Sequence, residues 1–197
     1  MDLILLKPGN QSVFGDQEKN SIETGGSLIA PGDWTWDEGI DYNPKSEAAI
    51  ELVSVHQGMK QQVTTDVSNS ARTSGRPIIT EFTCVKYVDK SSVKFYDYCL
   101  RAQPLDDRNT PPTSIYVCRN SGDKMILIMR FRLRFALISE IQFQSHPDDM
   151  ATEQFKLNFT EVLWDFTVQT ADLESVQGKK HAGWSLAKNC PIGDFTK

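Results

Sequence analysis

The strongest pattern in the chain is a long alternation of apolar and polar residues between positions 124 and 144. A period of two residues predicts a half-buried β-strand, and the length of the run predicts a bend near Ala136–Ser139. Residues 113–119 predict a preceding strand, and the turn-forming residues 120–123 join the two into a hairpin. The apolar face carries, in order, Phe131, Leu133, Phe135, Leu137, Ile141 and Phe143.

Residues 154–169 form a second long alternation whose phase changes partway. The apolar positions are Phe155, Leu157 and Phe159, followed by Val162, Trp164, Phe166 and Val168. A slip of one residue exchanges the two faces of a strand. This pattern predicts either a β-bulge near Thr160–Glu161 or a strand that passes from one packed layer into another.

One helix is predicted between the strands. Apolar side chains recur at helical spacing after Val93, at Phe95, Tyr96, Cys99 and Leu100. Asp89 or Ser91 can cap the start of this helix, and Pro104 lies just beyond its end. The β-prone run 77–83 comes before it, so this region predicts strand, turn and helix in that order.

Residues 39–77 differ from the rest because they are mostly polar. Turn residues occur at Asn43–Pro44, and only residues 50–55 carry an apolar alternation. A segment of this length without strong patterning is usually functional or disordered. We therefore expect a long projecting arm over 39–77 within a single, mainly β domain that spans residues 1–197.

Composition and charge narrow the class of protein. The chain has 197 residues, 39% of them hydrophobic, which suits one soluble domain with a real core. Its net charge of −5 gives no general attraction for nucleic acid or for an anionic membrane. Nucleic acid is therefore not expected as a partner, and no stretch is apolar enough to predict membrane insertion.

The N-terminal apolar run and the spacing of the cysteines bear on localisation. The apolar run at Leu3–Leu6 is too short for a signal peptide and is followed at once by Pro8 and Gly9. The cysteines are widely spaced, with no C-x-x-C pair, which is typical of reduced thiols in a cytoplasm. We expect synthesis in the cytoplasm, and any export to occur without a cleavable signal.

Candidate chemistry is sparse. The three histidines lie far apart, and only the segment 146–149 (HPDD) combines a histidine with nearby carboxylates. A solvated turn explains this segment better than a metal site, because a metal site needs further ligands. No nucleophile elbow, P-loop or dinucleotide fingerprint is present. We therefore predict no catalytic, cofactor-binding or metal-binding residue, and no enzyme.

Two motifs remain open to a functional interpretation. Arg130, Arg132 and Arg134 form a basic row on one strand face. This row predicts either a charged wall or surface for an acidic partner, or cross-strand pairing with acidic residues such as Glu161 and Asp165. The tryptophans of Trp34–Thr35–Trp36 lie on one strand face, and like Trp184 they are more typical of core or interface packing than of a ligand platform.

Several segments, in order, resemble the haemolysin-coregulated protein (Hcp) family, the inner-tube subunit of bacterial type VI secretion systems. The segments are Ile4–Lys7, Trp34–Trp36, Phe82–Thr83 with Lys86–Ser92, the hairpin at 113–143, Glu153–Phe159, and Gly178–Asn189. Together they cover most of the chain.

This resemblance implies a β-barrel-like sandwich with one helix that assembles as a homo-hexamer. The rings are expected to stack into a hollow tube, to meet sheath, spike and effector proteins, and to leave the cell with effectors. Thr35 is implied as a cargo contact in the lumen, where the ring can act as a chaperone. The arm is implied to mediate ring stacking, through Asn43, Ile50, Leu52 and Val55.

The chain departs from the family in the length of its arm and in the basic row, which leaves stacking geometry and lumen charge open. Two other functions compete with the secretion tube. One is a phage-type tail-tube protein, and the other is a small β-sandwich hydrolase that uses residues 146–149.

Overall fold

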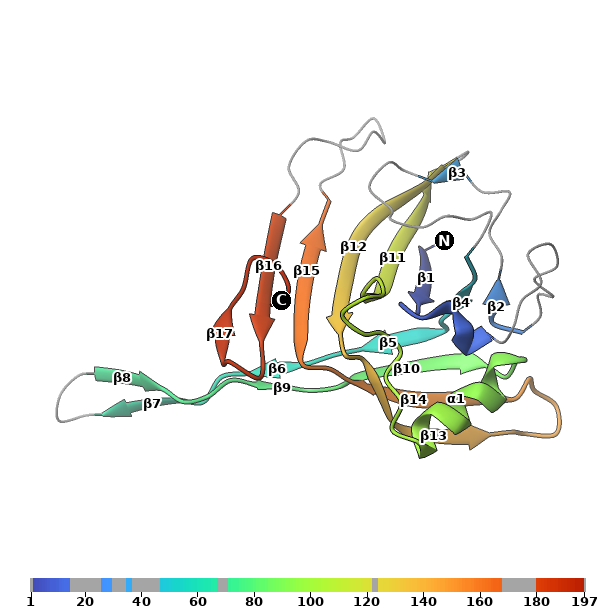
Figure 1. Ribbon diagram of the computed structural model, residues 1–197, viewed down its shortest axis with the longest axis horizontal. Coiled ribbons are helices and arrows are strands. Elements are labelled where there is room, and N and C mark those ends of the chain that lie inside the picture. The colour runs from blue at the N-terminus through green and yellow to red at the C-terminus, as the bar shows by residue number, and fades with distance from the viewer. Residues whose placement is uncertain are drawn as a thin grey trace.

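The computed structural model describes residues 2–14, 26–29, 35–36, 47–66, 71–121, 124–167 and 180–196. In these ranges strands dominate, and a single α-helix is present. The strands form one large sheet, one small sheet and a narrow ribbon that projects from the body (Figure 1). The strands of the large sheet run up and down in Figure 1, whereas those of the small sheet run across it.

The large sheet has nine strands in the order β17-β16-β15-β12-β11-β1-β4-β2, with β3 paired to β12 outside this path. Neighbours are antiparallel, except that β3 runs parallel to β12. The bounds are β1 Asp2–Lys7, β2 Leu28–Ile29, β3 Thr35–Trp36, β4 Ala49–Glu51, β11 Thr113–Ser121, β12 Lys124–Arg134, β15 Glu161–Phe166, β16 Lys180–Ser185 and β17 Cys190–Pro191.

The small sheet has four strands in the order β13-β14-β10-β5, all antiparallel. They are β5 Ser54–His56, β10 Phe82–Tyr87, β13 Leu137–Gln144 and β14 Thr152–Asn158. The ribbon pairs β6 Met59–Lys60 with β9 Ile78–Ile79 and β7 Val63–Asp66 with β8 Ala71–Ser74. The α-helix α1 spans Ser91–Leu100, and a 3-10 helix η1 spans Gln11–Phe14.

The chain passes between the two sheets several times, and two of these crossings lie side by side. The first runs from β12 through Phe135 into β13, and this confirms the predicted bend. Phe135 has a positive φ of 52°, which is unusual for a residue with a side chain. The buried carboxylate of Asp106 accepts the amides of Phe135 and Ala136 at 2.8 Å each, and so holds this corner.

The corner changes which residues face the core. After it, Ile138 is buried and Leu137 is only half-buried, although the uninterrupted alternation had predicted Leu137 inside. A register shift between Ile138 and Glu140 then lets Ile141 pack against the core. The break in the strand therefore moves the core-facing positions by one residue, and the bulge moves them back.

The second crossing connects β14 to β15 through residues 159–160. The change of phase in the apolar alternation of residues 154–169 therefore marks a strand that passes from the small sheet into the large sheet, the second of the two predicted alternatives. The Thr160 amide and hydroxyl both donate to the carbonyl oxygen of Arg134, at 3.0 and 3.1 Å. These hydrogen bonds join the two crossings, which lie side by side.

The core lies between the two sheets. Ile115, Leu133 and Val162 of the large sheet meet Phe82 and Phe155 of the small sheet. The helix closes one end of this core, where the Phe95 and Phe155 rings pack edge to face with centroids 5.3 Å apart. Asp89 accepts the amide and hydroxyl of Ser91 at the start of the helix, as one of the two predicted caps.

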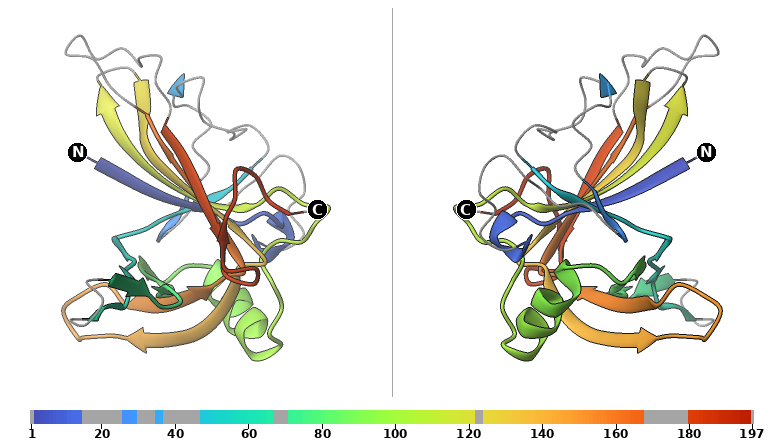
Figure 2. Two further views of the ribbon diagram at one scale, coloured as in Figure 1. Left: turned by 90° about the vertical axis from the view of Figure 1, so that its left-hand side faces the viewer. Right: turned by 90° about the vertical axis from the view of Figure 1, so that its right-hand side faces the viewer.

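The architecture confirms the mainly β, antiparallel class with one helix among the described residues. The sheets pack as a sandwich and do not close into a barrel, as the side views show (Figure 2). The α-helix has ten residues, too few to cross a lipid bilayer, and the described ranges contain no longer apolar helix.

A projecting arm is also present, but it begins later than predicted. The ribbon of β6 to β9 forms the arm, which extends to the side of the body in Figure 1. Ile50 and Leu52 were placed in the arm, and this placement is wrong: both are buried in the core, with 0% and 4% of their surface exposed. Val55 lies in β5 and packs against the same core. Asn43 lies outside the described residues.

Candidate functional site

The arm presents apolar side chains to solvent. Met59, Val63 and Ile78 expose 60%, 56% and 49% of their surface. A two-stranded ribbon has too little width to bury such side chains within itself. Met59 pairs with Ile79 and Ile78 pairs with Lys60, so Met59 and Ile78 lie on opposite faces and both faces of the ribbon carry an exposed apolar group.

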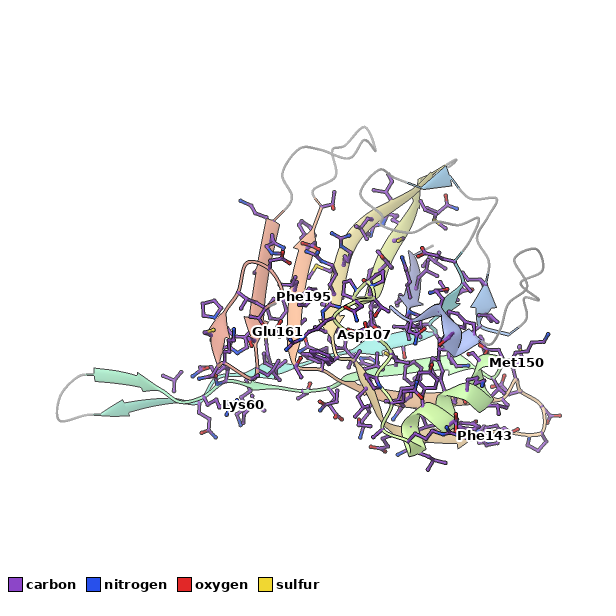
Figure 3. All side chains as sticks on the ribbon, viewed as in Figure 1. Lys60, Asp107, Phe143, Met150, Glu161 and Phe195 are labelled. Atoms are coloured by element: carbon purple, nitrogen blue, oxygen red, sulfur yellow. The ribbon has the colours of Figure 1, made fainter. Side chains whose placement is uncertain are left out.

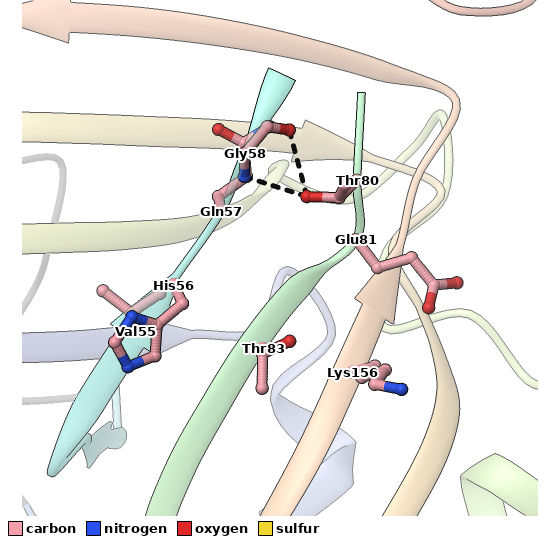
Figure 4. A pocket seen from close by; sticks show the side chains of 8 residues that line it. All are labelled: Val55, His56, Gln57, Gly58, Thr80, Glu81, Thr83 and Lys156. Carbon is pink, nitrogen blue, oxygen red and sulfur yellow. Dashed lines mark hydrogen bonds between the residues drawn. The ribbon is translucent and has the colours of Figure 1, made fainter. Parts of the chain in front are cut away.

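Hydrogen bonds join the two strands at the base of the arm, and one more joins the arm to the body. The Gly58 amide donates to the Thr80 hydroxyl at 2.8 Å, and the Thr80 amide and hydroxyl donate back to the Gly58 carbonyl at 2.9 and 3.0 Å (Figure 4). Farther out, Arg76 donates to the carbonyl oxygen of Leu186, in the turn after β16, at 2.5 Å. The arm is thus held at both its own strand pair and the edge of the large sheet.

A cavity of about 480 Å³ opens beside the base of the arm (Figure 4). Eight residues line it: Val55, His56, Gln57, Gly58, Thr80, Glu81, Thr83 and Lys156. Lys156 forms an ion pair with Glu140, and the hydrogen bond between them raises the pKa of Lys156 and lowers the pKa of Glu140. Both groups are held in their charged forms, which is the opposite of an acid or base tuned to neutral pH.

The basic row lies on the other face of the large sheet, away from the core between the sheets. The Nε atoms of Arg130 and Arg132 lie 2.8 and 3.0 Å from the same Asp165 oxygen. His181 of β16 lies 2.6 Å from the second Asp165 oxygen. The cross-strand register places Arg130, Asp165 and His181 in one line across three strands. Cross-strand pairing, one of the two open alternatives, is therefore present for Arg130 and Arg132.

The third arginine has different partners. Arg134 donates to the carbonyl oxygens of Asp107 and Thr110 at 2.6 and 3.1 Å and lies 3.5 Å from the Asp106 carboxylate. Its guanidinium also stacks on the Phe195 ring, 4.7 Å from the centroid. The arginines are thus occupied within the chain, and their role as a charged wall stays a prediction.

The shifted pKa values in this row follow from its contacts. Burial raises the pKa of Asp165, but the hydrogen bond from His181 and the charges of Arg130 and Arg132 outweigh burial and leave it lowered. The hydrogen bond to Asp165, followed by that to the Gly193 carbonyl, raises the pKa of His181. Each partner stabilises the charged form of the other.

A short segment at residues 190–196, called here the closing segment, folds over this row. Thr196 donates its amide and hydroxyl to Glu161 at 3.0 and 2.5 Å. Figure 3 shows Phe195 and Glu161 over the same part of the large sheet. Glu161 was predicted as a possible partner for the arginines, but it accepts hydrogen bonds from this segment instead.

Gly183 permits the closing segment to lie this close. A Cβ at position 183 would lie 2.3 Å from a methyl carbon of Leu163 and 2.8 Å from the carbonyl oxygen of Ile192. The Ile192 amide donates to the Gly183 carbonyl at 3.0 Å, which needs this approach. Glycine is therefore required here for close packing of two backbones.

The segment 146–149 forms a turn, as predicted. The Asp149 amide donates to the His146 carbonyl at 3.3 Å, and the His146 ring contacts Gln144 at 2.9 Å. Across the ranges that the structure describes, no group of three or more potential metal ligands is found.

The tryptophan motif is only partly described. Thr35 and Trp36 form β3, next to Lys124 and Met125 of β12, while Trp34 lies outside the described residues. The lumen contact of Thr35 stays a prediction. Trp184 packs against the core between the two sheets, in agreement with the predicted role in packing.

One buried polar cluster was not predicted from the sequence. Lys86 has no exposed side-chain surface and forms ion pairs with Glu153 at 2.7 Å and Asp89 at 2.9 Å. Ser92 donates to Glu153 at 2.8 Å, and Tyr96 does the same at 2.8 Å. The available signal was position: Lys86 and Glu153 occupy inward places in the alternations of β10 and β14.

Fold and surfaces together define a two-sheet β-sandwich with an arm suited to contacts between chains. A sequence model of the family described as "Type VI secretion system effector, Hcp" matches residues 35–166. The chain therefore belongs to the Hcp family of type VI secretion proteins.

Individual relatives agree with this family. Protein hcp1 of Pseudomonas aeruginosa is 24% identical over 112 residues, which are 56% of this chain and 66% of that protein, just under two-thirds of its length. A structure of a type six secretion system protein has a TM-score of 0.70 at 17% identity and covers 98% of this chain and 100% of that one. Hcp1 from Salmonella typhimurium has a TM-score of 0.62 at 16% identity, with 97% and 99% coverage. These structures show that the fold is shared.

Proposed function

We propose that this chain is a structural subunit of a type VI secretion tube, and that residues 1–197 act as one tube domain. Six copies form a ring, and rings stack into a hollow tube. The observation that carries this proposal is the family match over residues 35–166, which includes both the arm and the small sheet. The role is structural and needs no catalytic group.

The arm supports the stacking step. Its exposed Met59, Val63 and Ile78 lose contact with water only if another chain covers them. Contacts between unlike surfaces of identical chains continue without limit along an axis, which suits stacked rings. We propose that the arm of one ring packs on the next ring.

The remaining parts of the proposal concern partners and export. The tube assembles in the cytoplasm, meets sheath, spike and effector proteins, and leaves the cell without a cleavable signal peptide. Thr35 faces the lumen and contacts cargo, which the ring stabilises before export. Arg130, Arg132 and Arg134 set the charge of one wall of the subunit.

Light scattering on purified wild-type protein tests assembly. The expected mass at high concentration is that of six chains or of multiples of six. Met59→Lys and Ile78→Lys are expected to leave single rings but to abolish larger species, because they place charge in the stacking contact. Leu100→Lys is the matched control, since Leu100 is 88% exposed on α1, outside the arm.

A monomeric wild-type protein over the whole concentration range contradicts the proposal. Export is tested separately by the amount of this chain in the culture medium. Deletion of the secretion machinery is expected to remove it from the medium and to leave its cytoplasmic level unchanged.

A further inference from the structure

His181 occupies an unusual position between two hydrogen-bond acceptors. Its Nδ1 lies 2.6 Å from the Asp165 carboxylate of β15, and its Nε2 lies 2.6 Å from the carbonyl oxygen of Gly193 in the closing segment. Neither partner has a proton to donate at neutral pH. Both contacts can be hydrogen bonds at the same time only if both ring nitrogens carry a proton.

The neutral imidazole has a single N–H group. When His181 loses its proton, one nitrogen lone pair must face either the Asp165 carboxylate or the Gly193 carbonyl at close range. The carboxylate is the stronger acceptor, so the remaining proton stays on Nδ1. The contact with Gly193 is the one that fails.

The closing segment has few other attachments. Among the residues that the structure describes, its contacts to the body are the pairing of β17 with β16, the Ile192 amide bond to Gly183, the Thr196 bonds to Glu161 and the Phe195 stack on Arg134. β17 pairs through only two residues, Cys190 and Pro191. A segment held by so few bonds opens at a low free-energy cost.

From this geometry we propose that His181 is a pH-sensitive latch, whose doubly protonated ring fastens the closing segment over the charged face of the large sheet. Deprotonation releases the Gly193 end and uncovers Arg134 and Glu161, which Phe195 and Thr196 contact in the closed form. The latch does not depend on the proposed tube function.

The charges around the latch come from each neighbouring element: Asp165 from β15, Arg130 and Arg132 from β12, Lys180 next to His181 on β16, and Asp194 in the closing segment. The arginines oppose protonation of His181, but they are paired with Asp165. The hydrogen bonds to Asp165 and Gly193 dominate and raise the pKa of His181 above its ordinary value of 6.5.

The direction of the switch follows from linkage. Because the bond to Gly193 raises the pKa of His181 in the latched state above its value in the open state, where Asp165 still holds the ring, the latch is strongest below both pKa values and weakens as pH rises through them. Between the two values, the equilibrium for opening shifts by about tenfold per pH unit. The closed form is therefore the form favoured by acid.

Two measurements on the full-length protein test the latch. Nitrogen NMR of the His181 ring gives its protonation state, and amide hydrogen exchange of Ile192–Thr196, corrected for intrinsic rates, gives the opening equilibrium. We expect both to change with one common midpoint above pH 6.5, and protection to fall about tenfold or more across it. His181→Gln is expected to remove the pH dependence, whereas His146→Gln, in an exposed turn, is expected to retain it.

Gly183→Ala supplies an independent check if His181→Gln does not fold. It displaces the closing segment by contact with Ile192, so the segment should exchange rapidly at every pH, while the pKa of His181 falls but stays above its ordinary value because the bond to Asp165 remains. If the amide protection of Ile192–Thr196 in the wild-type chain does not change with pH, the proposal is overturned. So does a segment whose opening midpoint differs from that of His181, or a His181→Gln variant with an unchanged profile.

Discussion

The buried cluster around Lys86 and the projecting arm differ in where their side chains find partners. Lys86 is fully buried, yet Glu153, Asp89 and Ser92 supply its partners within the same chain. Met59, Val63 and Ile78 of the arm are apolar, yet they stay exposed. The first region is complete as a monomer, whereas the second would be covered by another chain in the stacking that we propose. Variants in the two regions should therefore separate stability from assembly.

The largest loss of stability is expected for Glu153→Gln. It leaves the buried ammonium of Lys86 without its 2.7 Å carboxylate partner, and breaking a buried ion pair costs about 3–5 kcal/mol. Urea unfolding at constant slope measures this loss. The matched control is Glu140→Gln, which breaks a partly exposed ion pair with Lys156 and is expected to cost much less. A cost below about 1 kcal/mol for Glu153→Gln contradicts this account.

A smaller loss is expected for Asp165→Asn. The amide keeps the shape of the side chain but removes the negative charge that Arg130, Arg132 and His181 share. Because these groups are partly hydrated, the expected cost at pH 7 is about 2–3 kcal/mol, measured by the same unfolding experiment. Asp97→Asn is the control, since its pair with Arg101 on α1 is exposed and should contribute under about 1 kcal/mol.

The acid dependence of stability should report Asp165 as well. Its pKa is lowered from the ordinary 3.8, so its contribution is complete above that value and is lost as pH falls through the lowered pKa. Below pH 3.8 the wild-type chain is therefore expected to lose stability more steeply than Asp165→Asn. Unfolding curves at a series of acidic pH values measure the two slopes, and equal slopes count against the assigned charge pairing.

The smallest effect on stability is expected in the arm. Met59→Lys and Ile78→Lys replace exposed side chains, so each should change the free energy of unfolding by less than about 0.5 kcal/mol. The same variants are expected to abolish ring stacking. An arm variant that destabilises the isolated chain as much as Glu153→Gln would show that the arm belongs to the core and not to an interface.

Much of the fold could be predicted because long alternations fix strand faces. The bend after Arg134, the crossing at Thr160 and the helix after Asp89 all follow from local pattern and turn chemistry. The sequence also favoured a turn at residues 146–149. In each case the decisive residues lie within a few positions of one another.

The misses share one cause, which is dependence on distant partners. Ile50 and Leu52 read as part of a polar arm, but pairing of β4 with β1 carries them into the core. Lys86 and Glu153 lie 67 positions apart and meet only because β10 pairs with β14. His181 joins Asp165 and Gly193 through the order of β15, β16 and β17. Local patterns do not encode such contacts.

Negative-stain electron microscopy of the concentrated wild-type protein tests the tube subunit most directly. Class averages are expected to show six-fold rings with an open centre, and side views are expected to show those rings stacked end to end. Single compact particles at every concentration, with no rings, would contradict the assignment.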